Sequence, residues 1–158
     1  MTYATLKHLF QHMAWADNEI ISALEKTSED KEDALKLLAH IIAAEHIWLS
    51  RILSQNLGDF TPWKKLTLQE CKGLAETNRE GYFTLAAPTT DLQLNNLITY
   101  KTTKGDEYHS RLGDILLHVA LHGAYHRGQI ASLLRSCQLP PPPTDFILFS
   151  RNVLPGLH

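Results

Sequence analysis

Apolar residues recur every three or four positions through four separate segments of the chain, and this spacing limits the fold more than any other feature of the sequence. A repeat of that length places the apolar side chains on one face of an α-helix, whereas a half-buried strand shows alternation at every second residue. The four expected helices span residues 2–26, 33–55, 67–86 and 112–137. Four amphipathic helices in one chain predict an all-α protein built as a four-helix bundle.

Particular residues mark the ends of the third helix. Thr67, with Glu70 three residues later, has the spacing of a capping box, which predicts a helix start. Pro88 predicts the end of the same helix, because proline has no N–H for the helical hydrogen bond. Gly73 and Gly81 weaken the pattern between these ends, since glycine is a poor helix former.

Two segments outside the helices have a different character. Residues 97–100 and 107–109 flank a glycine-containing turn at 103–106, which predicts a small β-hairpin just before the last helix. Its strands are too short to form a sheet core, so we expect it to decorate the bundle. After the last helix, the prolines at 140–143 predict an extended segment, and the apolar run 146–149 is expected to pack back onto the helices.

Composition predicts one soluble domain covering residues 1–158. The formal charge is −2 and no block of Lys and Arg occurs, so we expect no nucleic-acid partner. The chain has no apolar signal core and no run of about 18 apolar residues, which predicts a cytoplasmic protein without a membrane partner. Cys71 and Cys137 lack the paired spacing of a cysteine zinc site and are expected to be free thiols.

The chain holds nine histidines, and two of them lie one turn apart in the last helix. At about 100° per residue, His122 and His126 are neighbours that can chelate one ion. Both point toward the interior of the bundle or its edge, whereas His118 projects further out. Inward imidazoles need partners for their nitrogens. A divalent metal satisfies that need and so do separate hydrogen bonds, and the spacing leaves both interpretations open.

The three residues after His126 add to this segment. Arg127 can reach the carboxylate of a neighbouring helix or an anionic group of a substrate. Gly128 costs about 1 kcal/mol in a helix relative to alanine, so we expect close interhelical packing there, or the approach of a backbone or ligand. Gln129 can donate or accept a hydrogen bond at the edge of the site.

The same residues carry a resemblance to a known family. The run His122-x-x-x-His126-Arg127-Gly128-Gln129 resembles the H-x-x-x-H-R-G-Q signature of the DinB-like (damage-inducible) family. Residues 38–51 resemble that family's characteristic stretch in the second helix, and residues 14–18 resemble its first-helix element. Residues 100–105 match the hairpin that usually precedes its last helix. The resemblance covers nearly the whole chain.

The resemblance implies a four-helix bundle that holds a metal through three histidines, one from the second helix and two from the last. By position these are His40, His122 and His126. Relatives that share the fold include bacillithiol S-transferases and mycothiol-dependent maleylpyruvate isomerases, which use the metal with a low-molecular-weight thiol. Imidazole ligands suit Zn²⁺ or Ni²⁺ better than Mg²⁺ or Ca²⁺.

The helical wheel of the second helix leaves the ligand from that helix open. The apolar stripe brackets Glu45 rather than His40, which lies toward the other side. Glu45 is therefore a rival, either as a carboxylate ligand or as an acid that pairs with Arg127, and His46 is a third option. His40 reaches the metal only if the site lies in an outer cleft between helices.

The expected activity is that of a metal-dependent enzyme, and more specifically of a thiol-dependent S-transferase acting on a small electrophile. Arg127, Glu45 and His118 are the candidate catalytic residues beside the metal ligands; His118 is a base, a substrate contact or simply solvated. A metal-dependent hydrolase and a non-catalytic metal-binding protein are the alternatives, because a fold and a metal do not name a reaction. A homodimer formed through the 146–149 tail and exposed aromatics such as Trp63 is also expected.

Overall fold

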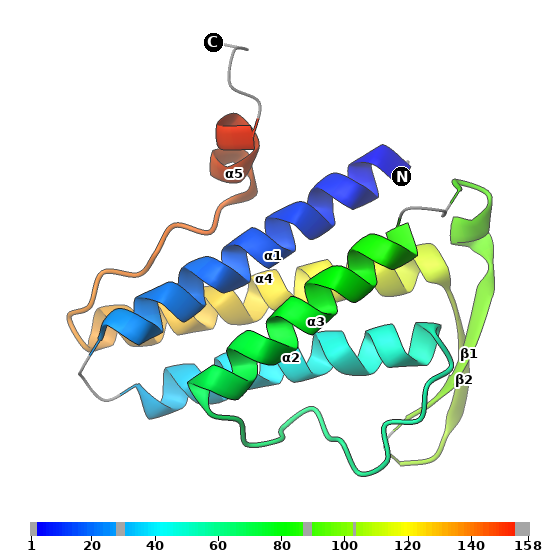
Figure 1. The fold of residues 1–158 in the computed structure, drawn as a ribbon, viewed down its shortest axis with the longest axis horizontal. Helices are drawn as coiled ribbons and strands as arrows, with labels where there is room; N and C mark the ends of the chain where they lie inside the picture. Colours follow the sequence, from blue (N-terminus) through cyan, green and yellow to red (C-terminus); the bar gives the residue numbers. More distant parts are fainter. Residues whose placement is uncertain (1–2, 28–30, 87–89, 103, 154–158) are drawn as a thin grey trace.

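The computed structural model describes residues 3–27, 31–86, 90–102 and 104–153. It is mostly helical, with a two-stranded hairpin before the last long helix (Figure 1). The elements in chain order are α1 (Tyr3–Lys26), α2 (Glu32–Ile52), α3 (Leu68–Ala86), the short 3-10 helix η1 (Gln93–Asn95), β1 (Leu97–Lys101), β2 (Glu107–Arg111), α4 (Leu112–Ser136) and α5 (Phe146–Val153). The predicted all-α bundle with a small hairpin is confirmed.

The four long helices form the bundle, in which α2 packs against α4 and α3, and α1 packs against α3 and α4 (Figure 1). Apolar side chains fill the space between them in two clusters. One surrounds Leu24, Leu38 and Ile130, and the other, nearer the hairpin, surrounds Phe10 and Leu116. The periodic apolar residues of the sequence therefore do form the core.

A polar layer separates the two apolar clusters. Each long helix contributes one buried polar side chain to it, about midway along its length: Asp17, Glu45, Asn78 and Arg127. Buried polar groups are costly unless they find partners. The partners of these four residues, described below, determine what the layer does.

The capping box at the start of α3 is confirmed. The backbone N–H of Thr67 donates to Glu70 Oε2 at 2.7 Å, and the N–H of Glu70 donates to Thr67 Oγ1 at 3.2 Å. Of the two glycines inside α3, Gly81 has a packing reason, because the side chain of Leu49 on α2 fills the place where a Cβ would project. Pro88, expected to end this helix, lies outside the described residues.

The end of α2 comes three residues earlier than the expected position 55. Ser54 has a φ of +55°, and the N–H of Gln55 donates to the carbonyl of Ser50 at 2.8 Å. The left-handed Ser54 and the hydrogen bond from Gln55 back to Ser50, five residues earlier, form a Schellman motif. The left-handed position is usually glycine, but here it is serine. The turn sends residues 53–66 back along α2, where they form one wall of the candidate site.

The hairpin is antiparallel, with Leu97 opposite Arg111 and Lys101 opposite Glu107. Its turn includes Gly105, whose φ is +91°, and Thr103, which lies outside the described residues. Most of its side chains are exposed, as expected for a decoration. Strand β1 contacts α2, so the hairpin forms a wall near the end of that helix.

The segment after α4 contains no helix or strand between residues 139 and 145, and the apolar run beyond it forms the short helix α5. Phe149 is buried where α5 packs against α1, while Phe146 keeps part of its surface exposed. Both cysteines are free, Cys71 buried and Cys137 exposed. Over the described ranges, no helix combines the length and apolar character needed to cross a membrane.

Candidate metal centre

Three histidines converge where α2 packs against α4. Each of His40, His122 and His126 offers a ring nitrogen, and these nitrogens all lie within 4.8 Å of one another. The Nε2 atoms of His40 and His122 are 3.1 Å apart. The structure therefore selects His40 from the three residues of α2 that the sequence left open, and it leaves Glu45 and His46 outside the cluster.

The position of His40 explains why the helical wheel favoured Glu45. A wheel identifies the side of a helix that faces the core, and Glu45 lies there, almost completely buried. His40 lies at the edge of the bundle, between α4 and the loop that follows α2, and it is only 8% exposed because Trp63 covers it. The Trp63 ring stacks on the imidazole with centroids 3.7 Å apart and planes 9° apart.

Hydrogen bonds orient two of the three imidazoles. His40 Nδ1 donates to the backbone carbonyl of Pro62 at 2.8 Å, and His126 Nδ1 donates to Gln129 Oε1 at 2.7 Å. With the proton on Nδ1, the Nε2 atom of each ring carries a lone pair. Such partners on the far nitrogen are the usual means by which proteins fix histidine ligands of metals.

Two of the three rings, those of His40 and His122, lie in an environment that favours their neutral form. Burial lowers the pKa of His122 to about 4, and the nearby charges of His126, His40 and His118 act in the same direction. Burial also lowers the pKa of His40, against the opposing effect of its bond to Pro62. Neutral imidazole is the form that binds metals.

The donor set fits a divalent ion. Tetrahedral zinc with Zn–N bonds of about 2.05 Å separates its ligand nitrogens by about 3.3 Å, close to the 3.1 Å between His40 and His122. In the part of the chain that the structure describes, no fourth His, Cys, Asp or Glu joins the three histidines. Three protein ligands with a further position open to solvent or substrate is the arrangement of catalytic zinc sites.

Arg127, next to His126 in the chain, lies on the other side of α4. Its guanidinium is 2% exposed, and Nη1 donates to Asp17 Oδ1 at 2.8 Å. Of the two roles expected for Arg127, the structure shows the ion pair with a neighbouring helix. Its charge is used inside the bundle and is not presented to a substrate at the three histidines.

Glu45 belongs to the same buried layer. Its pKa is raised well above the usual range by burial first, and then by the negative charge of Asp17 and a hydrogen bond to it. Asn78 Nδ2 donates to Glu45 Oε2 at 3.4 Å, but Oε1 meets no donor among the described residues. Protonation of the Glu45 carboxyl accounts for this atom, because the neutral carboxyl then donates a hydrogen bond to Asp17. Glu45 is thus a structural partner of the Asp17–Arg127 pair.

His118 and His46 have different surroundings. His118 is exposed, with its ring centroid 5.7 Å from that of His122 and 5.4 Å from that of Trp48. His46 Nδ1 donates to Asn78 Oδ1 at 3.0 Å and so supports the buried layer. Only His118 lies beside the candidate metal centre.

The close packing expected at Gly128 is not found among the described residues, and the close approach occurs at another glycine. A Cβ on Gly128 would meet nothing within 4 Å, whereas a Cβ on Gly123 would lie 2.8 Å from Arg127 Nη1. Gly123 therefore makes room for the buried guanidinium. Sequence reasoning named Trp63 only as an exposed aromatic of the expected dimer contact and missed its stacking on His40. The loop that carries Trp63 has no periodicity and gives no local signal of that contact.

Comparisons with known proteins agree with these features. Residues 1–153 match a family model described as the DinB family. The chain is also similar to a curated relative, "Protein DinB" from Bacillus subtilis (strain 168), with 23% identity over 165 residues. That alignment covers 89% of this chain and 91% of the relative, so the similarity extends through the whole bundle.

Proposed function

Because the chain belongs to the DinB family, we propose that it is a metal-dependent enzyme that joins a low-molecular-weight thiol to a small electrophile. His40, His122 and His126 hold the ion, Zn²⁺ or Ni²⁺ by ligand preference. The observation that carries the proposal is the convergence of three imidazoles, two of which, His40 and His126, have their far nitrogens engaged in hydrogen bonds. The two Nε2 atoms lie 3.1 Å apart, which is hydrogen-bonding distance and also close to the spacing that two nitrogen ligands of one zinc ion require.

A bound ion of this kind would lower the pKa of the thiol and so supply a thiolate nucleophile near neutral pH. The residues of the chain prepare the place for that chemistry. Pro62 and Gln129 hold two of the rings in one orientation, and the stacked Trp63 keeps water away from one face of His40. A site that is oriented before the substrate arrives loses less entropy when the reaction begins.

His118 is the group placed to handle a proton. Its exposed ring lies beside His122, within reach of solvent. In the transfer, the thiol loses its proton, sulfur forms a bond to the electrophilic carbon, and the leaving group departs with the bonding electron pair. We assign His118 the role of accepting the thiol proton, in place of the roles expected of Arg127 and Glu45, whose side chains are buried in the layer behind the site.

The transferase and the alternative hydrolase use the same site and differ in the nucleophile. The purified, metal-loaded protein is mixed with chlorodinitrobenzene and one thiol. The reaction is repeated with several different thiols, one at a time. The transferase consumes one thiol for each chloride released, whereas a hydrolase releases chloride without consuming thiol. The triple variant His40→Ala/His122→Ala/His126→Ala should show only the uncatalysed rate, and His109→Ala, which removes an exposed hairpin histidine, should match wild type. Equal rates for wild type and the triple variant across all thiols would contradict the proposal.

A further inference from the structure

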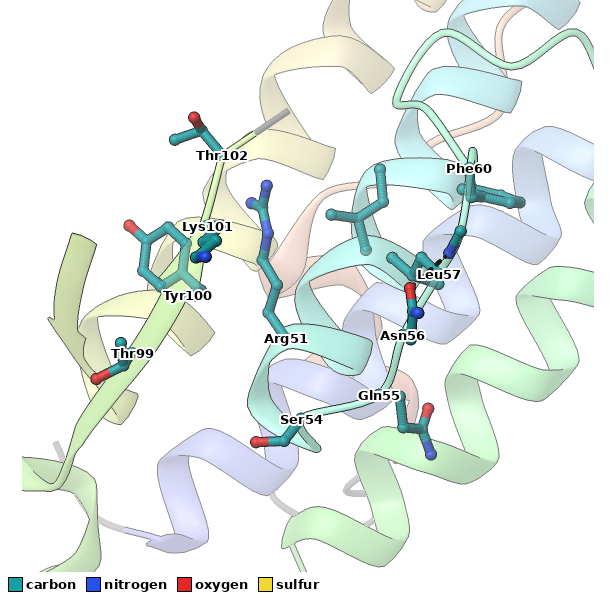
Figure 2. A pocket seen from close by; sticks show the side chains of 12 residues that line it. Arg51, Ser54, Gln55, Asn56, Leu57, Phe60, Thr99, Tyr100, Lys101 and Thr102 are labelled. Atoms are coloured by element: carbon teal, nitrogen blue, oxygen red, sulfur yellow. Dashed lines mark hydrogen bonds between the residues drawn. The ribbon is translucent and has the colours of Figure 1, made fainter. Parts of the chain in front are cut away.

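A cavity lies at the end of α2. The cavity has a volume of about 500 Å³ and lies between the last two turns of α2, the loop that follows, and β1. Figure 2 shows the side chain of Arg51 extending from α2 between β1 on one side and the loop on the other. Its lining includes Arg51 and Lys101 together with several hydroxyl and amide side chains, and it includes no Asp or Glu.

Arg51 is held in place by aromatic rings. Its guanidinium carbon lies 4.6 Å from the centroid of the Trp48 ring and 5.1 Å from that of Tyr100. The hydroxyl of Tyr100 is in turn 3.1 Å from Ser110 Oγ, which fixes the second ring. Stacking of this kind orients the planar guanidinium and leaves its N–H groups directed outward.

Arg51 differs from the other two described arginines that are at least half-buried, Arg79 and Arg127, because it has no carboxylate partner among the described residues. Arg127 is paired with Asp17 and Arg79 with Glu76, but over the described ranges no acidic side chain forms an ion pair with Arg51. Lys64, whose amine lies 4.8 Å from the centroid of the Phe60 ring, adds a further positive charge near the loop wall. An oriented, half-buried guanidinium without an acid is a receptor for an oxyanion.

The cavity and the histidine cluster share the same helix. His40, Ile47 and Arg51 are seven and then four residues apart, so they lie along one face of α2. At 1.5 Å per residue, Ile47 at the edge of the cavity lies about 10 Å from His40 along the helix axis. His40, Ala44 and Ile47 are buried along this face, so a molecule that reaches both places passes over Trp48 and His118, whose rings lie between Arg51 and His122.

The two regions also share their walls. In the loop after α2, Phe60 lines the cavity while Pro62 and Trp63 contact His40. On the opposite side, ring contacts run without interruption from Tyr100 to Trp48, then to His118 and His122.

We propose that this cavity binds the carboxylate or phosphate end of the substrate whose thiol end reaches the three histidines. The inference rests on the proposed function, because the histidine site defines the reactive end. About 10 Å separates His40 from the edge of the cavity along the helix axis, and about 16 Å, over eleven residues, separates it from Arg51. These distances correspond to roughly three to five residues of extended peptide chain, which sets the size of the molecule. The substrate class is thus an extended, anionic, peptide-sized thiol.

The first experiment tests the anion site without any metal. Isotope-labelled, metal-free protein is titrated with inorganic phosphate and with succinate while the amide and arginine Nε NMR signals are followed. We expect saturable shifts at Arg51 Nε and at the amides of Thr99 and Lys101, and the tighter ligand identifies the oxyanion. Arg51→Gln should weaken binding by at least about tenfold, since hydrogen bonds to charged groups are the strong ones.

Arg79→Gln is the matched control for that titration. Arg79 also lies over an aromatic ring, 5.7 Å from the centroid of Phe83, but it is paired with Glu76 and lies outside the cavity. Its loss should leave binding unchanged. An absence of saturable shifts with both anions would overturn the inference whatever the histidines bind, and so would equal effects of the two arginine substitutions.

The second experiment links the two sites. Cobalt-substituted protein is titrated with glutathione, a tripeptide thiol with free carboxylates, and with its diethyl ester, and thiol coordination is read from near-ultraviolet absorption. We expect the ester to bind at least about tenfold more weakly than the acid in wild type, and equally with it in Arg51→Gln. Equal binding in wild type would overturn this inference and leave the proposed function standing. Anion binding at Arg51 without any thiol coordination would overturn the proposed function, and with it the assignment of the anion as substrate.

Discussion

Nη1 of Arg127 on α4 donates a hydrogen bond of 2.8 Å to Oδ1 of Asp17 on α1, and both side chains are almost completely buried. Arg127 directly follows His126, so this ion pair anchors the segment of α4 that carries two of the three clustered histidines. Gly123 gives the guanidinium its space, and protonated Glu45 completes the layer. The polar core and the metal centre thus occupy opposite sides of the same stretch of helix.

Removal of Arg127 should strongly destabilise the fold. Arg127→Met leaves the carboxylate of Asp17 buried without a counter-charge, which costs about 3–5 kcal/mol in comparable buried pairs. The free energy of unfolding, measured by urea denaturation, should fall by that amount, whereas Arg135→Met at the exposed end of α4 should change it by less than about 0.5 kcal/mol. The double variant Asp17→Asn/Arg127→Met should recover part of the loss. Similar small losses for both single variants would show that the pair contributes little.

The two glycines of the His-Gly-Ala-Tyr-His-Arg-Gly run should respond in opposite ways to alanine. Gly123→Ala places a methyl group against the Arg127 guanidinium and should cost about 1–3 kcal/mol, the usual range for overpacking. Gly128→Ala enters open space and should stabilise the protein by up to about 1 kcal/mol through helix propensity. Thermal unfolding of the two variants side by side tests this, and equal shifts in Tm would count against the arrangement described.

The raised pKa of Glu45 predicts a pH-dependent difference between wild type and Glu45→Gln. A carboxyl whose folded pKa lies above its unfolded value, about 4.3, contributes stability below that pH and loses it as pH rises toward the folded pKa. Glutamine is neutral throughout. The stability of wild type relative to the variant should therefore fall by about 1.4 kcal/mol per pH unit above roughly pH 4.3.

Urea denaturation of both proteins at a series of pH values between acid and neutral measures that slope, because the titrating groups that do not interact with Glu45 cancel in the difference. A difference that stays constant with pH would mean that Glu45 has an ordinary pKa.

Gln129 should matter for metal affinity although it is not among the three ligands. Its carbonyl accepts the Nδ1 proton of His126, and loss of such a partner typically reduces metal affinity about 10–100-fold. Gln129→Leu should therefore bind Zn²⁺ more weakly by that factor in competition with a chromogenic chelator. Gln69→Leu, an exposed change on α3, is the control and should bind as wild type does. An unaltered Zn²⁺ affinity in Gln129→Leu would show that Gln129 does not orient His126 for metal binding.

Much of the fold was predictable because it depends on local pattern. The apolar period located the four long helices, and the Thr67–Glu70 box identified the start of α3. The neighbouring positions of His122 and His126 also follow from helix geometry alone. These features need only residues close together in the chain.

The rest depends on contacts between distant residues. The wheel of α2 placed Glu45 inward correctly, but it does not show that the loop carrying Pro62 and Trp63 covers His40 at the edge of the bundle. Likewise the sequence marks two glycines near Arg127 without showing which of them the guanidinium approaches. His40 was identified through the family resemblance, and its place beside the other two histidines through the three-dimensional structure.

Elemental analysis of untagged protein tests the central claim most directly. Wild type and His40→Ala/His122→Ala/His126→Ala are purified in parallel and their metal content is compared. The account predicts about one divalent ion per chain in wild type, as expected for a three-histidine site, and none in the variant. Wild-type protein that carries no metal and cannot be loaded with Zn²⁺, Ni²⁺ or Mn²⁺ would contradict it.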